Sequence, residues 1–353
     1  MSGEMVDGPR VGYVPLRPSM QPPGDRRRFP AWAVDRDVPF SVVGDWDGLD
    51  VVVLSSEVDL IRWRNVPDDV VLIVDLPDAF LDEGRSLRTT ARGFAKWVAG
   101  PLSRPVTNHH RAMGRLLARA DAVVCSTPEQ AENLCRYSSN VHVALDLHRE
   151  IAPVSPVRRE SGGRLEVVWE GLFPTLAAIE PVLPALQDLS GSIDVVLHLV
   201  TDRRAPRFMN RFMPVDVSSV VSDWGIPVEI HDWGVDVLRD VASRCDLAIV
   251  PVDRGDPYTL GKPENRLRIF WRLGLMVLGS ESPSHRRACR VAGVSDEVLC
   301  TTTGDWFQAL DQYGHDPDLR FRVAEVGHEA ALDIYGDESV LSAWDRVWGS
   351  VGL

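Results

Sequence analysis

The chain has 353 residues, of which 44% are hydrophobic and 25% are charged, and its formal net charge is -13. This length and composition predict two globular domains with separate cores, which need neither disulfides nor a metal to fold. The acidic balance excludes a broad nucleic-acid surface, because phosphate binding needs clustered basic residues.

Cysteine and hydropathy patterns predict a cytoplasmic protein. The five cysteines form no C-x-x-C pair, and Cys125, Cys245 and Cys300 lie in or beside apolar runs, as free thiols do. The first residues do not show a basic segment followed by an apolar one, and no apolar run approaches ~18 residues. We therefore expect no signal peptide and no transmembrane segment, which leaves only peripheral contact with a membrane open.

Short, nearly continuous apolar runs recur through the first 150 residues. They include VGYV at 11, VVVL at 51, VVLIVD at 70 and AVVC at 122, and helix-length segments separate most of them. Continuous apolar character is typical of strands that are covered on both faces. Residues 1–150 are therefore predicted to form a parallel, doubly wound α/β domain, which binds ligands beyond the carboxyl ends of its strands.

Three consecutive arginines follow the first of these strands. Arg26, Arg27 and Arg28 come after a long loop, where a helix is predicted to begin near Gly24 or Asp25. A helix N-terminus and guanidinium groups together favour phosphate or carboxylate, so the triplet is a candidate phosphate or acceptor loop. A solvated helix face is the alternative explanation.

Two carboxylates and a histidine are candidate catalytic groups. Asp75 ends a buried strand, and Asp78 follows in a turn that Pro77 stiffens. Either carboxylate could be a general base whose pKa is raised by desolvation, or could cap the next helix. His109 opens another helix, where it could shuttle a proton or bind an acceptor, or simply begin a surface helix.

The start of one helix in this half is explained by structure alone. Thr127 suits the N-cap, Pro128 the first helical position and Gln130 the third residue of a capping box. We assign no chemistry to this segment.

The alternation of apolar runs and helix-length segments stops over residues 149–163 and then resumes. This stretch has prolines, a glycine pair and several charges without periodicity, which predicts an interdomain linker over 151–163. Further apolar runs predict a second doubly wound domain over 164–335. Two such sheets facing each other would form one deep ligand cleft.

Several residues of the second half follow predicted strands. Gly171 would let the backbone approach a ligand closely, and Arg203 could clamp a diphosphate or remain solvated. Trp233 and Pro251 each follow a later strand. All four are candidates for ligand contacts at the carboxyl edge of the sheet.

The segment GKPENRLRIFWR (261–272) predicts a helix with one buried apolar face and a basic start. Lys262 and Arg266 have the wrong sign for the positive end of a helix dipole, and Glu264 and Asn265 lie between them. A phosphate bound there would offset this local cost. If these residues reach solvent instead, the cost is only tenths of a kcal/mol.

Together these segments resemble the GT-B glycosyltransferases, in particular the retaining bacterial enzymes with a "glycosyl transferases group 1" C-terminal domain. The resemblance rests on ADAVVCSTPEQAENL, VVWEG, CDLAIVPV and GKPENRLRIFWRLGLMVLGSESPSHRR. It implies two Rossmann-like domains, with the acceptor held by the first and a nucleotide-diphosphate sugar by the second. It also implies transfer without a required metal or another cofactor, and a final helix over 336–353 that packs back on the first domain.

The resemblance also suggests roles for individual residues. Arg266 matches the basic residue at the donor phosphates, Gly171 matches the glycine after the first strand, and Pro251 flanks base and ribose. Glu264 and Asn265 fall near the donor sugar or ribose, Trp233 falls near the base, and Lys262, Arg203 or the triplet could supply further positive charge. The E-x7-E signature of the family is absent, because its two glutamates fall near Gly261 and on Ile269.

The leading hypothesis is a retaining, metal-independent hexosyltransferase of glycan or glycoconjugate biosynthesis. It would move a sugar from a nucleotide-diphosphate donor to a hydroxyl of a glycan, a lipid-linked acceptor or a small molecule. If the reaction inverts the anomeric centre, Asp75 or Asp78 is the candidate base. The absent signature favours an alternative, a non-catalytic sugar-nucleotide-binding subunit of a glycosyltransferase complex. An epimerase on the same fold would need an acid/base pair that we do not find in the sequence.

Overall fold

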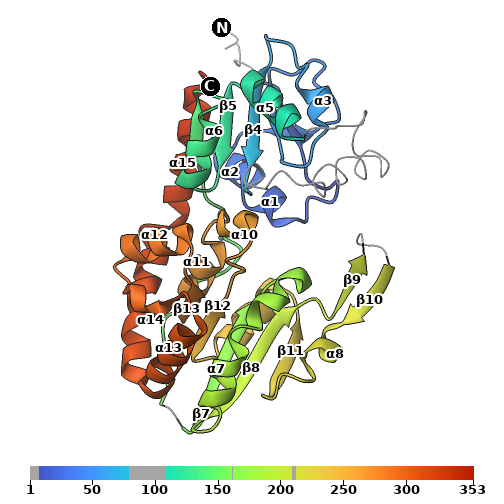
Figure 1. The fold of residues 1–353 in the computed structure, drawn as a ribbon. Helices are drawn as coiled ribbons and strands as arrows, with labels where there is room; N and C mark the ends of the chain where they lie inside the picture. Colours follow the sequence, from blue (N-terminus) through green and yellow to red (C-terminus); the bar gives the residue numbers. More distant parts are fainter. Residues whose placement is uncertain (1–7, 79–108, 161, 209–211) are drawn as a thin grey trace. The chain divides into compact units, whose positions relative to one another are not determined.

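The computed structural model describes residues 8–78, 109–160, 162–208 and 212–353 (Figure 1). It divides into two compact units. The first comprises Met1–Leu147, Gly261–Pro263 and Glu338–Leu353, and the second comprises His148–Leu260 and Glu264–Asp337. Among the described residues, no helix combines the length and the apolar character needed to cross a membrane.

The first unit contains a six-stranded sheet in the order β2-β1-β3-β4-β5-β6, with all neighbours parallel. The strands are β1 (Val11–Val14), β2 (Phe40–Val42), β3 (Val51–Leu54), β4 (Val71–Leu76), β5 (Ala122–Cys125) and β6 (Val141–Val143). Every residue of β3 and β5 is buried, as expected for central strands of a covered sheet. The predicted parallel α/β sheet is therefore confirmed.

Helices cover both faces of this sheet. They are α1 (Pro23–Arg26), α2 (Phe29–Asp35), α3 (Leu60–Trp63), α5 (His109–Arg119), α6 (Pro128–Leu134) and α15 (Asp337–Ser350). One core cluster contains Trp63 of α3, Leu116 of α5 and Leu134 of α6. A separate cluster contains Trp32 of α2 and Trp344 of α15, so the sheet is doubly wound.

The last helix of the chain completes the core of the first unit. The ring of Trp344 lies 6.0 Å from Phe29 and 6.3 Å from Trp32, measured between centroids. Asp345 accepts hydrogen bonds from Trp32 Nε1 at 2.7 Å and from Arg36 Nε at 3.0 Å. Aromatic packing and a charged rim together join α15 to α2.

The second unit contains another parallel sheet, in the order β11-β8-β7-β12-β13-β14. Its strands are β7 (Arg164–Glu170), β8 (Asp194–Thr201), β11 (Val228–Asp232), β12 (Leu247–Val250), β13 (Met276–Ser280) and β14 (Leu299–Cys300). A separate antiparallel pair is formed by β9 (Arg204–Phe208) and β10 (Phe212–Asp216).

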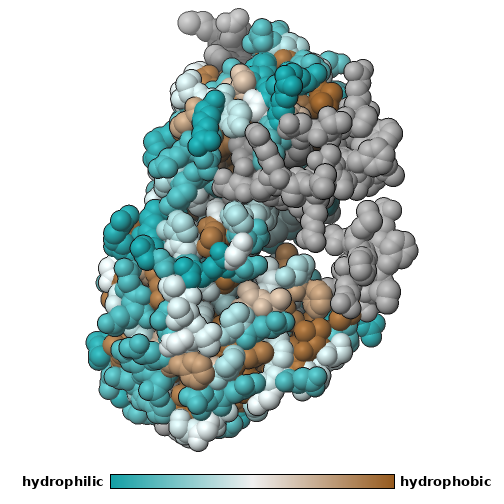
Figure 2. Space-filling model, in the orientation of Figure 1, coloured by the Kyte–Doolittle hydropathy of each residue, from teal (hydrophilic) through white to brown (hydrophobic). Residues whose placement is uncertain are grey.

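The helices of the second unit follow its strands. They are the 3-10 helices η1 (Phe173–Ile179) and η2 (Asp296–Val298), and α7 (Leu183–Leu189), α8 (Val217–Val221), α9 (Val235–Ala242), α10 (Pro257–Leu260), α11 (Asn265–Arg272), α12 (Pro283–Ala292), α13 (Thr303–His315) and α14 (Pro317–Leu332). Figure 2 shows mainly hydrophilic residues over the outer helices α12 and α14.

The expectation that α11 buries only an apolar face is wrong. Every residue from Leu267 to Arg272 is buried. Arg268 lies over the ring of Tyr335 at 5.2 Å, and Arg272 donates to the carbonyl oxygen of Ile151 and pairs with Asp337 at 3.1 Å. These partners offset the cost of burying the two charges, so the basic side of the helix is also enclosed.

Residues 152–160 have no regular secondary structure and run against the end of α11. The N–H of Val154 donates to the carbonyl oxygen of Arg272 at 3.0 Å. Gly274 has a φ of +72°, and a Cβ there would collide with the carbonyl oxygen of Val154. Glycine is therefore required at this turn for both conformation and space.

Candidate functional site

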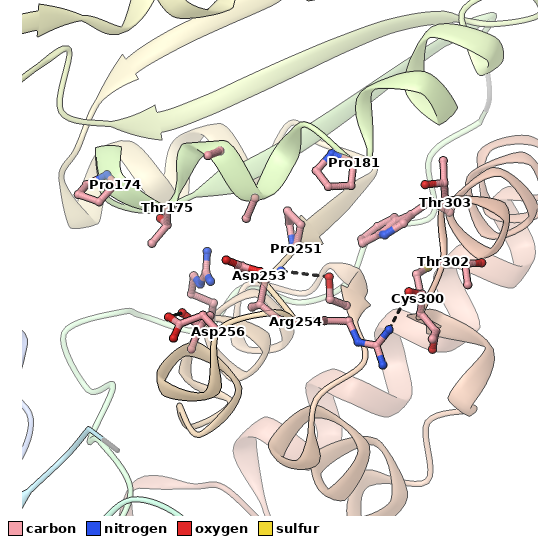
Figure 3. Close-up of a pocket in the computed structure, with 18 residues that line it drawn as sticks. Pro174, Thr175, Pro181, Pro251, Asp253, Arg254, Asp256, Cys300, Thr302 and Thr303 are labelled. Carbon is pink, nitrogen blue, oxygen red and sulfur yellow. Dashed lines mark hydrogen bonds between the residues drawn. The ribbon is translucent and has the colours of Figure 1, made fainter. Parts of the chain in front are cut away.

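A cavity of about 540 Å³ lies within the second unit, where β12, β13 and β14 end (Figure 3). Its position agrees with the rule that parallel α/β sheets bind ligands beyond the carboxyl ends of their strands. Figure 3 shows Pro174, Thr175 and Pro181 on one side and the loop after β12 facing them. The labelled residues of the other walls are Pro251, Asp253, Arg254, Asp256, Cys300, Thr302 and Thr303.

The loop after β12 is held in place by local hydrogen bonds. Pro251, predicted as a donor contact, is buried directly after the strand and lines the cavity. The N–H of Val252 donates to Ser280 Oγ at 3.0 Å, and Asp253 accepts from the N–H of Gly255 at 2.9 Å. The loop thus presents carboxylate and backbone groups at fixed positions.

Arg254 connects the ends of two other strands. Its Nε donates to the carbonyl oxygen of Glu281 at 3.2 Å, and another guanidinium nitrogen donates to the carbonyl oxygen of Thr301 at 2.7 Å. Its guanidinium also lies 3.6 Å from the Glu281 carboxylate. Arg254 therefore is a paired residue of the cavity wall and not an unpaired cation.

The start of α13 forms a further wall. Thr302 accepts from the N–H of Asp305 at 3.2 Å, and Asp305 accepts from the N–H groups of Thr301 and Thr302. These backbone donors lower the pKa of the Asp305 carboxyl. One residue later, Trp306 lines the cavity and is buried, so the helix supplies an aromatic surface at a rigid start.

Arg266 is the predicted phosphate ligand that lies in the cavity wall. It is half-buried in the first turn of α11, and one guanidinium nitrogen donates to the carbonyl oxygen of Glu170 at 3.3 Å. Among the described residues, no carboxylate lies within ion-pair distance of it. Burial lowers the pKa of the guanidinium and the charge of Glu170 opposes this, but an arginine stays cationic near neutral pH.

The other three residues predicted at this helix start do not line the cavity. Glu264 is 1% exposed and accepts from Arg287 at 2.9 Å; burial raises its pKa, and Arg287 opposes that rise. As the N-cap of α11 it makes no side-chain capping bond. Asn265 begins the helix, and Lys262 lies in the loop between α10 and α11.

Gly171 follows Glu170, the last residue of β7, and Trp233 contacts the side chain of Glu170. A Cβ on Gly171 would meet the ring of Trp169 at 2.6 Å and Thr175 Oγ1 at 2.8 Å, so close packing requires the glycine. Trp233 donates from Nε1 to the Glu170 carboxylate at 2.8 Å. Neither Gly171 nor Trp233 lines the cavity, although Thr175 does.

Arg203 lies apart from the cavity. Its guanidinium donates to the carbonyl oxygen of Ile230 at 2.6 Å and to the Asp232 carboxylate at 3.2 Å. These bonds hold it against β11, and it does not line the cavity. The predicted diphosphate clamp of Arg203 is therefore not part of the same pocket as Arg266.

In the first unit, Arg28 and Asp75 bind each other rather than an open site. Arg28 is 0% exposed and donates to the Asp75 carboxylate at 2.6 and 2.7 Å. The same guanidinium donates to Asp146 at 3.1 Å and to the carbonyl oxygen of Ala144 at 2.9 Å. Burial raises the pKa of the Asp75 carboxyl, and the charge of Arg28 opposes that rise. Arg28, the predicted phosphate ligand, and Asp75, the predicted base, therefore bind each other.

The remaining candidates of the first unit are spread over three places. Arg27 is buried, whereas Arg26 is partly exposed and donates to the carbonyl oxygen of Gln21 at 2.6 Å. Asp78 lies in the turn after β4. His109 is the first residue of α5, and its side chain lies outside the described residues. The described cavity is lined by residues of the second unit.

Sequence reasoning missed Trp306, Thr302 and Glu170. Glu170 holds both Arg266 and Trp233, and the other two line the cavity. Their positions in the sequence could have indicated them, because all three residues fall at a strand end or a helix start. Such positions in a parallel sheet converge on the ligand edge.

No protein-family model matches the sequence, and no curated protein matches it. Solved structures do. HepE from Anabaena, in complex with UDP, superposes with a TM-score of 0.63 at 10% identity and covers 97% of this chain and 100% of its own. WaaG, a glycosyltransferase involved in lipopolysaccharide biosynthesis, gives 0.53 at 13% identity and covers 86% and 79%.

A variant of TarM from S. aureus, solved with fondaparinux, alpha-GlcNAc-glycerol and UDP, gives a TM-score of 0.57 at 7% identity. The match covers 84% of this chain and 55% of TarM, so the chain spans about half the length of that protein. These structures are GT-B glycosyltransferases. The chain therefore has the GT-B fold of two Rossmann-like units, and the predicted fold class is confirmed.

Proposed function

We propose that the chain is a glycosyltransferase that moves a sugar from a nucleotide-diphosphate-sugar donor to an acceptor hydroxyl. The observation that carries the proposal is the position of Arg266, a cation in the first turn of a helix, in the wall of the 540 Å³ cavity. A cavity of this volume is typical of small-molecule sites. UDP bound to HepE and to TarM supports a nucleotide ligand on this fold.

The donor diphosphate is assigned to Arg266 and the N-terminus of α11. Glu264 makes no side-chain cap at that N-terminus and its carboxylate pairs with Arg287 instead, so the helix dipole still favours an anion beside Arg266. When the glycosidic bond to the diphosphate breaks, negative charge develops on the leaving oxygen, which a fixed guanidinium stabilises. Lys262, in the loop before α11, is a second candidate cation.

The nucleoside is assigned to the opposite walls of the cavity. Trp306, Pro181 and Pro251 supply apolar surface of the kind that a nucleobase contacts. Asp253 and Asp256 are acceptors for ribose hydroxyls in the same cavity. This division places the base and the diphosphate at different walls, as an extended nucleotide requires.

We propose that transfer retains the anomeric configuration and needs no metal ion. The pairing of Asp75 with Arg28 makes that carboxylate a poor general base, because the pair is buried and both carboxylate oxygens already accept hydrogen bonds from the guanidinium. In a retaining reaction the leaving phosphate can accept the proton of the acceptor hydroxyl. Arg266 and the start of α11 supply positive charge at the position where a metal ion would otherwise bind diphosphate.

A non-catalytic, nucleotide-sugar-binding subunit is the second candidate. Ile269, which stands where the family has its second glutamate, is 4% exposed and belongs to the hydrophobic core. This helix position therefore supplies no carboxylate to the cavity.

A panel of UDP-, GDP- and dTDP-sugars tests the proposal. We expect isothermal titration to show one donor site per chain, and incubation with that donor to release its nucleoside diphosphate. Binding without any release, in the presence of acceptor mixtures, would favour the non-catalytic subunit. If no member of the panel binds, the assignment of the cavity as a donor site is wrong.

A further inference from the structure

Three side chains with metal-binding atoms converge at one edge of the second sheet. His198 lies on β8, and Glu229 and His231 lie on the edge strand β11. Glu229 pairs in register with His198, and His231 follows two residues later on the same face of the sheet. His198 Nδ1, Glu229 Oε2 and His231 Nε2 all lie within 4.8 Å of one another.

The separations of these atoms fit one bound ion. His198 Nδ1 lies 3.1 Å from His231 Nε2 and 3.5 Å from Glu229 Oε2, and the third separation, from His231 Nε2 to Glu229 Oε2, is 3.9 Å. The nearest point equidistant from three atoms so placed lies in their plane, about 2 Å from each, which is the length of a zinc–nitrogen or zinc–oxygen bond. We propose that His198, Glu229 and His231 bind a zinc ion.

A fourth residue orients the buried ligand. His198 Nε2 lies 2.7 Å from Glu166 Oε2 on β7, and the other oxygen of Glu166 lies 2.7 Å from Arg164 Nε. A carboxylate at this distance keeps the proton on Nε2 and leaves the lone pair of Nδ1 for a metal. Glu166 is thus a positioning residue, of the kind commonly found behind zinc-binding histidines.

Burial and ligand chemistry both favour zinc at this position. His198 is 3% exposed, whereas half of the Glu229 side chain is exposed, so an ion can enter from solvent past the carboxylate. Two imidazoles and one carboxylate suit zinc rather than magnesium or calcium, which prefer oxygen ligands. Three protein ligands leave a further position for water, and the exposed Glu229 side chain can shift so that the four ligands become tetrahedral.

A plain hydrogen bond between the two imidazoles would also explain their 3.1 Å separation. In that case His231 Nε2–H donates to His198 Nδ1, and metal binding replaces this proton as the bridge. The two explanations differ in whether a metal ion stabilises the folded chain. An ion that ties β11 to β8 stabilises the folded state by mass action.

The zinc site is separate from the proposed donor site. None of its three ligands, nor Glu166, lines the cavity of Arg266. Loss of zinc binding should therefore leave donor binding measurable, and a failed donor panel would not bear on zinc.

The test uses the full chain, freed of metal with a chelator. We expect one zinc ion per chain by titration calorimetry, and a visible absorption band of four-coordinate cobalt when Co²⁺ is used as the probe. At a zinc concentration 100 times Kd, the melting temperature of the second unit should rise by roughly 5–10 °C.

Substitutions make the test specific. His231→Ala and Glu229→Gln should each weaken zinc binding at least about 10-fold, which at the same zinc concentration cuts the melting shift to about half or less, and Glu166→Gln should weaken binding about 10- to 100-fold. Glu229→Gln changes an exposed side chain, so this variant still measures the role of the site in zinc binding even if the histidine variant folds poorly. His142→Ala is the matched control, because it removes another strand imidazole, which contacts Asn140 and Ser350. An unchanged Kd in both ligand variants, or no zinc binding by the parent chain, would overturn the proposal.

Discussion

At the scale of single residues, two arginines with similar sequence contexts have different environments. Arg28 and Arg266 both lie near the start of a helix, and both were predicted to bind phosphate. Arg28 is fully buried, with its donors bound to Asp75, Asp146 and neighbouring oxygen atoms. Arg266 makes one hydrogen bond to a backbone carbonyl and lines a cavity. The second environment is the one that can accept an anionic ligand.

Replacing Arg266 tests its role in transfer. Arg266→Ala should lower turnover by about 10²-fold or more, because a fixed cation at the leaving diphosphate is lost. Steady-state kinetics with the donor identified by the panel would measure this. Arg286→Ala is the control, because Arg286 is an exposed arginine of α12 and does not line the cavity. Equal turnover in the two variants would exclude a role for Arg266 in charge stabilisation.

Replacing Arg28 tests the buried ion cluster. Arg28→Ala leaves the Asp75 and Asp146 carboxylates without their cation, which should lower the free energy of unfolding of the first unit by about 3–5 kcal/mol. Urea denaturation would measure the change. Arg17→Ala removes a pair with Glu57 in which both side chains are largely exposed, so its effect should be well under that of Arg28→Ala. A loss of less than 1 kcal/mol for Arg28→Ala would contradict this account.

At the scale of elements, helix starts determine where polar groups are held. The predicted capping box of α6 is confirmed, with Thr127 accepting from the N–H of Gln130 at 3.1 Å. The same device begins α13 beside the cavity, where Thr302 and Asp305 form the box. At α12, Ser282 caps the helix and His285 in the first turn is buried.

His285 should make the stability of the second unit depend on pH. Burial lowers its pKa to about 4, and Nδ1 donates to the carbonyl oxygen of Ser280 at 2.7 Å. The unfolded chain, with an ordinary pKa near 6.5, therefore takes up a proton first as the pH falls. The stabilisation is complete above pH 6.5 and decreases towards pH 4, and about 2 kcal/mol of it should be lost at pH 5.

Denaturation of the second unit at pH 7 and at pH 5 measures this contribution. His285→Asn keeps a donor near Ser280 and removes the titrating group, so the variant should lose less stability than the parent on acidification. His315→Asn changes a half-exposed histidine at the end of α13 and should behave like the parent. If His285→Asn and the parent lose the same free energy between the two pH values, the buried imidazole is not responsible.

At the scale of the whole molecule, each unit has its own sheet and its own core clusters, and the first unit is built from three stretches of the chain. Residues 338–353 join the unit that begins at the N-terminus. Val340, Leu341, Trp344 and Val347 of α15 are buried in the same cluster as Phe29 and Trp32. The stability of the first unit should therefore depend on the last helix of the chain.

Trp344→Ala tests this dependence. The substitution removes a side chain that is 1% exposed and should lower the free energy of unfolding of the first unit by about 3–5 kcal/mol. Donor binding to the cavity of the second unit should be unchanged by titration calorimetry. Val326→Ala, at a position 36% exposed on α14, should cost far less. Loss of donor binding in a folded Trp344→Ala protein would contradict the assignment of the donor site to the cavity of the second unit.

Local pattern was enough to predict most elements. The apolar runs became strands of two parallel sheets, and the Thr-Pro-x-Gln signal became a capping box. Leu267, Phe270 and Trp271 are buried, as their spacing predicted. These predictions hold because an apolar run within a few residues indicates which side chains must be covered, and a helix cap is formed by neighbouring residues.

The sequence by itself therefore determined the class of fold and the cation at the start of α11. Only the tertiary structure decided which charged residues remain open to a ligand. It paired Arg28 with Asp75, which is 47 positions away, and placed Arg266 in a cavity with Trp306. It also brought His198 beside His231, 33 positions away in the chain. Such partners are chosen by strand order and packing, so no periodicity along the chain could have predicted them.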